Sequence, residues 1–111
     1  AAFTSQAVDD GEIRDTIRER YQRHGEVFCP HTATAVRVLE RLRASGQAAS
    51  GEDWAVAATA HPAKFESVVE PLIGRELEVP PALAALLRRP AHAEPCQPSL
   101  AELRHKLLDW G

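Results

Sequence analysis

The stretch from Trp54 to Phe65, which reads WAVAATAHPAKF, constrains the fold more than any other part of the sequence. Its first five residues are small or apolar, which is too short for a helix and the right length for a buried strand. A polar turn follows. Pro62 then marks a helix start, because a proline at the first helical position loses no hydrogen bond. We therefore predict a strand over 54–58, a turn at 59–61 and a helix after it.

The end of this predicted strand is a natural place for a ligand. In open α/β sheets, ligands bind beyond the carboxyl ends of strands, where a helix N-terminus favours an anion. A single buried strand cannot satisfy its own backbone hydrogen bonds. Either Ala1–Val8 and Val27–Cys29 pair with it, or its neighbours belong to a sheet outside this chain. The second alternative fits a piece of a longer polypeptide, which the absence of methionine also favours.

The rest of the chain is expected to be mainly helical. An apolar stripe of Ile13, Ile17 and Tyr21 follows Asp9 and Glu12, which have the spacing of a capping box. The expected fold class is therefore α/β and helix-rich, with about five helices and one or a few strands. The helices are expected at about residues 9–25, 30–46, 62–74, 80–87 and 99–110.

Composition narrows the classes of partner. A chain of 111 residues holds one domain with its own core. The net charge is -3 and no basic stripe is interleaved with aromatic residues, so we expect no nucleic-acid partner. No apolar run has the length of a membrane span and no signal peptide is visible, so we expect no membrane partner. Cys29 and Cys96 lack CxxC spacing, which favours free thiols in the cytoplasm.

The histidines have no spacing typical of a zinc site, and no metal site is predicted. His31 and His61 differ from the other histidines because each stands beside a proline at a predicted helix start. A neutral imidazole near free N–H groups suits an anionic ligand. The alternative is a histidine that caps or packs its own turn, and spacing alone favours this alternative at both positions.

Three other side chains, those of Lys64, Cys29 and Thr32, lie near these predicted turns. Lys64 lies one turn into a predicted helix, where a cation opposes the helix dipole unless an anion is bound. The simpler explanation is an exposed lysine. Cys29 lies near His31 in sequence, but no orienting acid accompanies the pair, so a nucleophile is not predicted. Thr32 opens a run of small residues that permits close approach of a ligand, although tight helix packing is favoured.

Two motifs carry a resemblance to a known family. The sequence TAHPAKF at 59–65 resembles the C-terminal part of threonine synthase. The sequence PHTA at 30–33 is similar to an upstream element of the same family, and the order of helices, motifs and strand also matches. A weaker match continues through EPLIG at 70–74. The resemblance covers most of residues 9–87.

The resemblance implies a pyridoxal-phosphate enzyme with a tryptophan-synthase-like fold. Such an enzyme is a lyase of threonine biosynthesis that converts O-phospho-L-homoserine to L-threonine and phosphate. Thr59 is then the hydroxyl that faces the pyridine nitrogen of the cofactor, and a neutral partner leaves that nitrogen largely unprotonated. The turn after the predicted strand, residues 59–64, is called the corner. The resemblance implies that the lining residues of the site at this corner are His61, Lys64, His31 and Thr32.

The resemblance also implies that essential parts lie elsewhere. The family's Schiff-base lysine and its phosphate-binding loop are expected upstream, and neither Lys64 nor Lys106 stands in the lysine's motif. We therefore expect residues 1–111 to be a single C-terminal portion of a larger enzyme, with no catalytic residue of its own and no activity alone. Its expected partners are the remainder of the threonine synthase chain and O-phospho-L-homoserine.

Two departures from the family pattern and one rival interpretation remain open. Cys29 stands before Pro30 where the family is expected to have an acidic residue, and Thr34-Ala35 replaces Val-Gly. The rival is a non-catalytic stand-alone binding or interaction module with a complete sheet. A fragment is instead expected to expose an apolar edge at Ala55–Ala58 and to associate.

Overall fold

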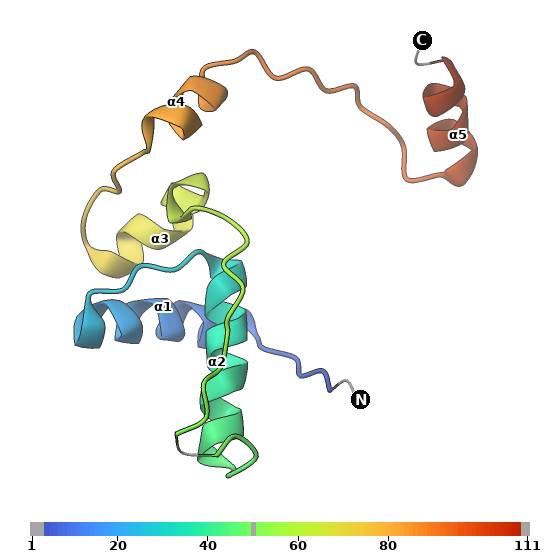
Figure 1. Cartoon of the computed structure of the whole chain (residues 1–111). Coiled ribbons are helices and arrows are strands. Elements are labelled where there is room, and N and C mark those ends of the chain that lie inside the picture. The colour runs from blue at the N-terminus through green and yellow to red at the C-terminus, as the bar shows by residue number, and fades with distance from the viewer. Residues whose placement is uncertain (1–3, 50, 110–111) are drawn as a thin grey trace. The chain divides into compact units, whose positions relative to one another are not determined.

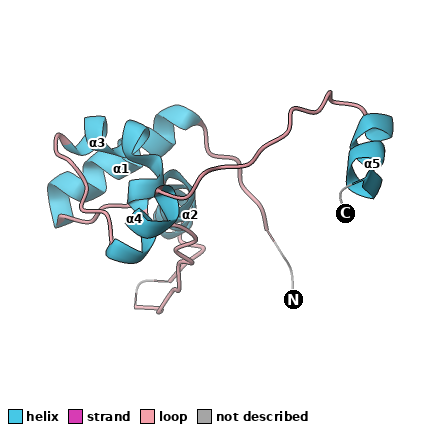
Figure 2. Ribbon diagram, turned by 90° about the horizontal axis from the view of Figure 1, so that it is seen from above, coloured by secondary structure: helices cyan, strands magenta, loops and turns pink. Residues whose placement is uncertain are grey.

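The computed structural model describes residues 4–49 and 51–109, and over these residues it contains helices and no strand. Figures 1 and 2 show the helices and the loops that join them. The chain divides into two compact units, Ala1–Val79 (unit 1) and Pro80–Gly111 (unit 2). The elements are α1 (Asp10–His24), α2 (Pro30–Ala44), the 3-10 helix η1 (Pro62–Phe65), α3 (Glu66–Ile73), α4 (Pro81–Leu87) and α5 (Leu100–Asp109).

The start and end of α1 follow directly from its sequence. The carboxylate of Asp9 accepts a hydrogen bond from the backbone N–H of Glu12 at 2.9 Å. The carboxylate of Glu12 accepts one from the N–H of Asp9 at 3.2 Å. Gly25 ends the helix in the left-handed conformation, with φ of 70°, which glycine adopts without strain. The predicted capping box is confirmed.

The core of unit 1 lies where α1, α2 and α3 meet. Ile17 of α1, Ala33 of α2 and Val69 of α3 are fully buried, and Ile73 is 7% exposed. Burial of an aliphatic side chain of this size stabilises the fold by about 1.5–3 kcal/mol. Because Ala33 lies in the first turn of α2, this core fixes the beginning of α2 against α3.

Ion pairs join α1 to α2 beside the core. The carboxylate of Glu12 accepts hydrogen bonds from Arg41 and lies 3.5 Å from Nε of Arg37. The hydrogen bond from Arg41, followed by the one from the backbone of Asp9, holds the pKa of Glu12 below its usual value. Arg41 also donates to the carbonyl of Ala7 at 2.8 Å, which holds the segment before α1 against α2.

The predicted strand over 54–58 is not formed in this chain. Within the described part, no backbone group from Asp53 to Ala60 has a hydrogen-bond partner. Neither 4–8 nor 27–29 pairs with this segment, and residues 1–3 lie outside the described residues. A strand requires a neighbour for its backbone groups, and the described residues provide none. Among the described residues the fold is therefore all-helical rather than α/β, and Trp54 is 45% exposed.

The helix expected after Pro62 is divided in two. Its first turn is the 3-10 helix η1, in which the N–H of Lys64 donates to the carbonyl of His61 at 3.1 Å. At Phe65 the backbone leaves the helical region, with φ of -130° and ψ of 35°, and α3 begins one residue later. Gly74 ends α3 as predicted.

Unit 2 contains two helices and no buried side chain among its described residues. The hydroxyl of Ser99 accepts from the N–H of Glu102 at 3.2 Å, at the predicted start of α5. Lys106 donates to the carbonyl of Pro95 at 2.6 Å. Trp110, the last residue of the helix predicted over 99–110, lies outside the described residues. No helix in the described ranges is long and apolar enough to cross a membrane.

Candidate functional site

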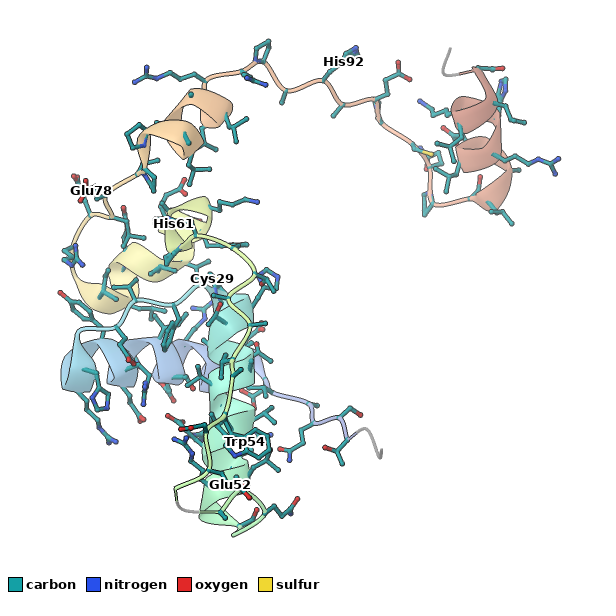
Figure 3. The ribbon with its side chains drawn as sticks, viewed as in Figure 1. Cys29, Glu52, Trp54, His61, Glu78 and His92 are labelled. Atoms are coloured by element: carbon teal, nitrogen blue, oxygen red, sulfur yellow. The ribbon has the colours of Figure 1, made fainter. Side chains whose placement is uncertain are left out.

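Two helix starts in unit 1 share the same construction. Both α2 and η1 have a proline at the first position, Pro30 and Pro62, and each is preceded by a side-chain cap. The Sγ of Cys29 accepts from the N–H of Thr32 at 3.4 Å. The Nδ1 of His61 accepts from the N–H of Ala63 at 3.2 Å. Figure 3 labels the two capping residues. The caps fix the direction in which the chain enters each helix.

The side chains of His31 and Phe65 join the start of α2 to the end of η1. Their ring centroids are 5.1 Å apart, with an interplanar angle of 61°, which is an edge-to-face contact. Thr32 is buried at 4% exposure, and its Oγ1 lies 3.2 Å from the Sγ of Cys29. His61 therefore caps its own turn, as one of the two interpretations predicts. His31 instead packs against η1.

The remaining predicted site residues are exposed. Thr59 is exposed and its hydroxyl makes no hydrogen bond to the described residues. Lys64 is also exposed, and only its backbone takes part in the η1 turn. No group of three or more metal-ligating side chains is found among the described residues.

A pocket of about 200 Å³ connects the predicted corner to α2. The pocket brings Thr32, at the start of α2, to the same cavity as Ala58, which precedes Thr59 in the chain. Its walls are mainly apolar, although two arginines and one glutamate also line it. The lining residues are Arg20, Phe28, Thr32, Val36, Leu39, Glu40, Arg43, Val56 and Ala58. Residues 56–58 therefore lie along α2 (Figure 1).

Sequence reasoning missed three structural roles near the corner. Cys29 caps α2, and the proline that follows it was the available signal, because proline at the first helical position makes the preceding residue the cap. Phe65 is the partner ring of His31. Glu70 accepts a hydrogen bond from the N–H of Leu77 at 2.9 Å, which fastens the segment after α3. Neither of the last two contacts has a local sequence signal.

The described residues thus define a helical unit with an unpaired extended segment and a capped, exposed corner, the kind of arrangement found where one part of a protein meets another. A family model described as "Threonine synthase, C-terminal" matches residues 32–106. The chain belongs to the threonine synthase family, within its C-terminal region. This confirms the resemblance given by the TAHPAKF and PHTA motifs.

Individual relatives agree with the family match. Threonine synthase from Serratia marcescens is 38% identical over 102 residues, which cover 92% of this chain and 22% of that protein. Threonine synthase from Pseudomonas aeruginosa is 39% identical over 88 residues, covering 78% of this chain and 18% of that protein. The crystal structure of threonine synthase from Escherichia coli matches with a TM-score of 0.76 and 33% identity, covering 96% of this chain and 23% of that one. The chain therefore spans about a fifth of the length of these relatives.

Proposed function

We propose that this chain is the C-terminal part of a threonine synthase, a pyridoxal-phosphate-dependent lyase of the cytoplasm. The complete enzyme converts O-phospho-L-homoserine to L-threonine and phosphate. The observation that carries the proposal is the family match over 32–106, because it includes the whole TAHPAKF corner. The chain's partners are the remainder of the enzyme and the substrate.

The residues of the corner fit one side of a pyridoxal-phosphate site. The cofactor supplies an electron sink, and the protein tunes it through groups beside the ring nitrogen. Thr59 offers an exposed hydroxyl that makes no hydrogen bond to the described residues, so it is available to such a nitrogen. Lys64 does not fit the role of the cofactor's lysine, because it lies in the PAKF turn of η1 and not in the family's lysine motif. That lysine belongs to the remainder of the enzyme.

The unpaired segment from Asp53 to Ala60 is the place where the remainder joins. Its backbone donors and acceptors have no partner among the described residues, and such groups are almost always paired when buried. Val56 and Ala58 face the apolar pocket against α2. In the complete enzyme this segment becomes a strand of the α/β sheet, and α2 covers one face of that sheet.

A chimera tests the catalytic proposal. The matching C-terminal region of the Serratia marcescens enzyme is replaced by this chain, and phosphate release from O-phospho-L-homoserine is measured with pyridoxal phosphate. We expect activity from the chimera and none from this chain alone or from the truncated relative. Borohydride reduction of this chain with pyridoxal phosphate should give no stoichiometric adduct at Lys64. Turnover by the isolated chain would contradict the proposal.

Two substitutions at Thr59 sharpen the test. Thr59→Ser keeps the hydroxyl, whereas Thr59→Val keeps the shape and removes it. We expect Ser to retain the activity of the chimera and Val to lower kcat about tenfold, which corresponds to about 1.4 kcal/mol for one lost hydrogen bond. Equal activity of the two variants would refute the assigned role of Thr59. Because the side chain is exposed, neither change should alter the stability of the isolated chain.

Hydrogen exchange tests the strand separately. We expect the amides from Asp53 to Ala60 to exchange without protection in the isolated chain and to become protected in the chimera. Amides of α1 and α2 serve as internal controls, protected in both proteins. An active chimera with an unprotected segment would overturn the strand and leave the catalytic proposal standing.

The second candidate function is a stand-alone binding or interaction module. The core of Ile17, Ala33, Val69 and Ile73, which three helices of unit 1 complete among themselves, favours it. A module of this kind melts cooperatively, is monodisperse and binds no dye for exposed apolar surface. The fragment proposal predicts dye binding and association through the 53–60 segment. An inactive chimera together with a dye-free, monodisperse chain would favour the module.

A further inference from the structure

The imidazole of His61 makes a contact that fixes its chemical form. Its Nδ1 accepts a hydrogen bond from the N–H of Ala63, so Nδ1 carries no proton and the proton of the neutral ring is on Nε2. The backbone of His61 is extended, with φ of -71° and ψ of 137°, as expected of an N-cap. The side chain is otherwise exposed. One nitrogen therefore holds the turn, and the other carries the proton of the neutral ring.

Three contacts hold the short element that follows Thr59. The cap from His61 fixes its beginning, and the bond from Lys64 N–H to the His61 carbonyl closes its turn. The edge-to-face contact of Phe65 with His31 fixes its end against the start of α2. Thr59 lies two residues before the cap and makes no hydrogen bond of its own to the described residues. The position of its hydroxyl therefore depends on how firmly the turn at His61 is held.

We propose that His61 is a positioning residue of the threonine synthase site, acting through its Nδ1 cap to hold Thr59 in place. This inference rests on the proposed function. The cap requires a hydrogen-bond acceptor two bonds beyond the Cβ atom. Asparagine places its Oδ1 where histidine has Nδ1, so His61→Asn preserves the cap. His61→Gln places its amide near the position of Nε2 and cannot make the same short-range cap. His61→Ala removes both groups.

Nitrogen NMR of the isolated chain tests the cap without any need for activity. The 15N shifts of His61 should show the tautomer that is protonated at Nε2. His105 is an internal control, because its Nδ1 lies 2.7 Å from the carboxylate of Asp109 and must carry a proton to donate to it. We expect opposite protonation of Nδ1 in the two residues. A protonated Nδ1 at His61 in the neutral ring would overturn the proposal.

Kinetics of the chimera test the positioning role. We expect His61→Asn to keep kcat within about threefold, and both Gln and Ala to lower kcat about tenfold with little change in KM. Rates are expressed per folded molecule, from melting curves recorded at the assay temperature. A merely structural role would lower the melting temperature in the Ala variant and leave kcat per folded molecule unchanged, which would overturn the proposal.

The remaining outcomes separate the inference from the proposed function. Full activity of the Gln variant with loss in Asn would show that Nε2 contacts the ligand directly, and that result would overturn the positioning role. An inactive chimera with the wild-type corner would refute the proposed function. The NMR result would then still decide whether His61 caps η1.

Discussion

The sulfur cap of α2 allows one prediction to be worked out from the contacts of a single side chain. Cys29 is 1% exposed, and its Sγ contacts both the N–H and the hydroxyl of Thr32. In Cys29→Ala the helix loses its cap, which costs about 1 kcal/mol. The buried hydroxyl of Thr32 also loses its partner, which costs about 1–3 kcal/mol. The expected destabilisation is about 2–4 kcal/mol, or about 10–20 °C in Tm for a domain of this size.

The matched control is Cys29→Ser. A serine hydroxyl accepts from the same N–H and contacts the same threonine, so we expect its stability within about 1 kcal/mol of the unchanged chain. Thermal melting of the full chain by far-UV circular dichroism measures all three proteins. If the alanine variant melts with the unchanged chain while the serine variant does not, the buried position requires an apolar side chain rather than a cap, and the reasoning fails.

Two further predictions concern the frame that holds the corner. Glu12→Gln should flatten the acid dependence of stability. The pKa of Glu12 is lowered in the folded state, chiefly by Arg41, so its stabilisation is complete above the unfolded-state pKa and is lost as the pH falls through the folded-state pKa. Urea midpoints at neutral and acid pH measure this, and an unchanged difference between them would contradict it. Ile17→Ala should cost about 2–5 kcal/mol, because Ile17 is fully buried. Leu107→Ala, at a residue that is 59% exposed, should change stability by less than about 0.5 kcal/mol, and equal losses would refute this assignment of the core.

Local signals in the sequence predicted the helices well. The capping box of Asp9 and Glu12, and the glycines Gly25 and Gly74, mark element ends at the residues where the structure has them. Each of these signals acts through atoms a few residues apart, so no tertiary information is needed. The helix predicted after Pro62 was wrong at Phe65, where the backbone leaves the helical conformation. Phe65 contacts His31 at this break, and the spacing of the apolar residues does not indicate it.

The strand predicted over 54–58 depends, unlike the helix ends, on residues that are distant in the sequence. The apolar residues there satisfy the requirements of a buried strand in composition and length, and the prediction was wrong for this chain because pairing depends on partners distant in sequence. The same limit applies to the corner. Sequence alone identified His31 and His61 by their prolines, but the ring that contacts His31 and the atom that His61 caps emerge only when the elements are assembled.

The proposed function accounts for the features of the corner by dividing the site between two parts of one protein. A corner that had to enclose a ligand alone would bury its polar groups, yet Thr59 and Lys64 are exposed and the segment before them has no backbone partner among the described residues. Unit 1 does fix the direction in which the chain enters α2 and η1. The side-chain caps of Cys29 and His61, the proline that follows each cap and the contact between His31 and Phe65 set this direction. Under the proposed function, the remainder of the enzyme presents the ligand to that turn. The stability of the turn is therefore expected to depend on Cys29 and His61 in the isolated chain, whereas the proposed activity requires these residues and the remainder of the enzyme together.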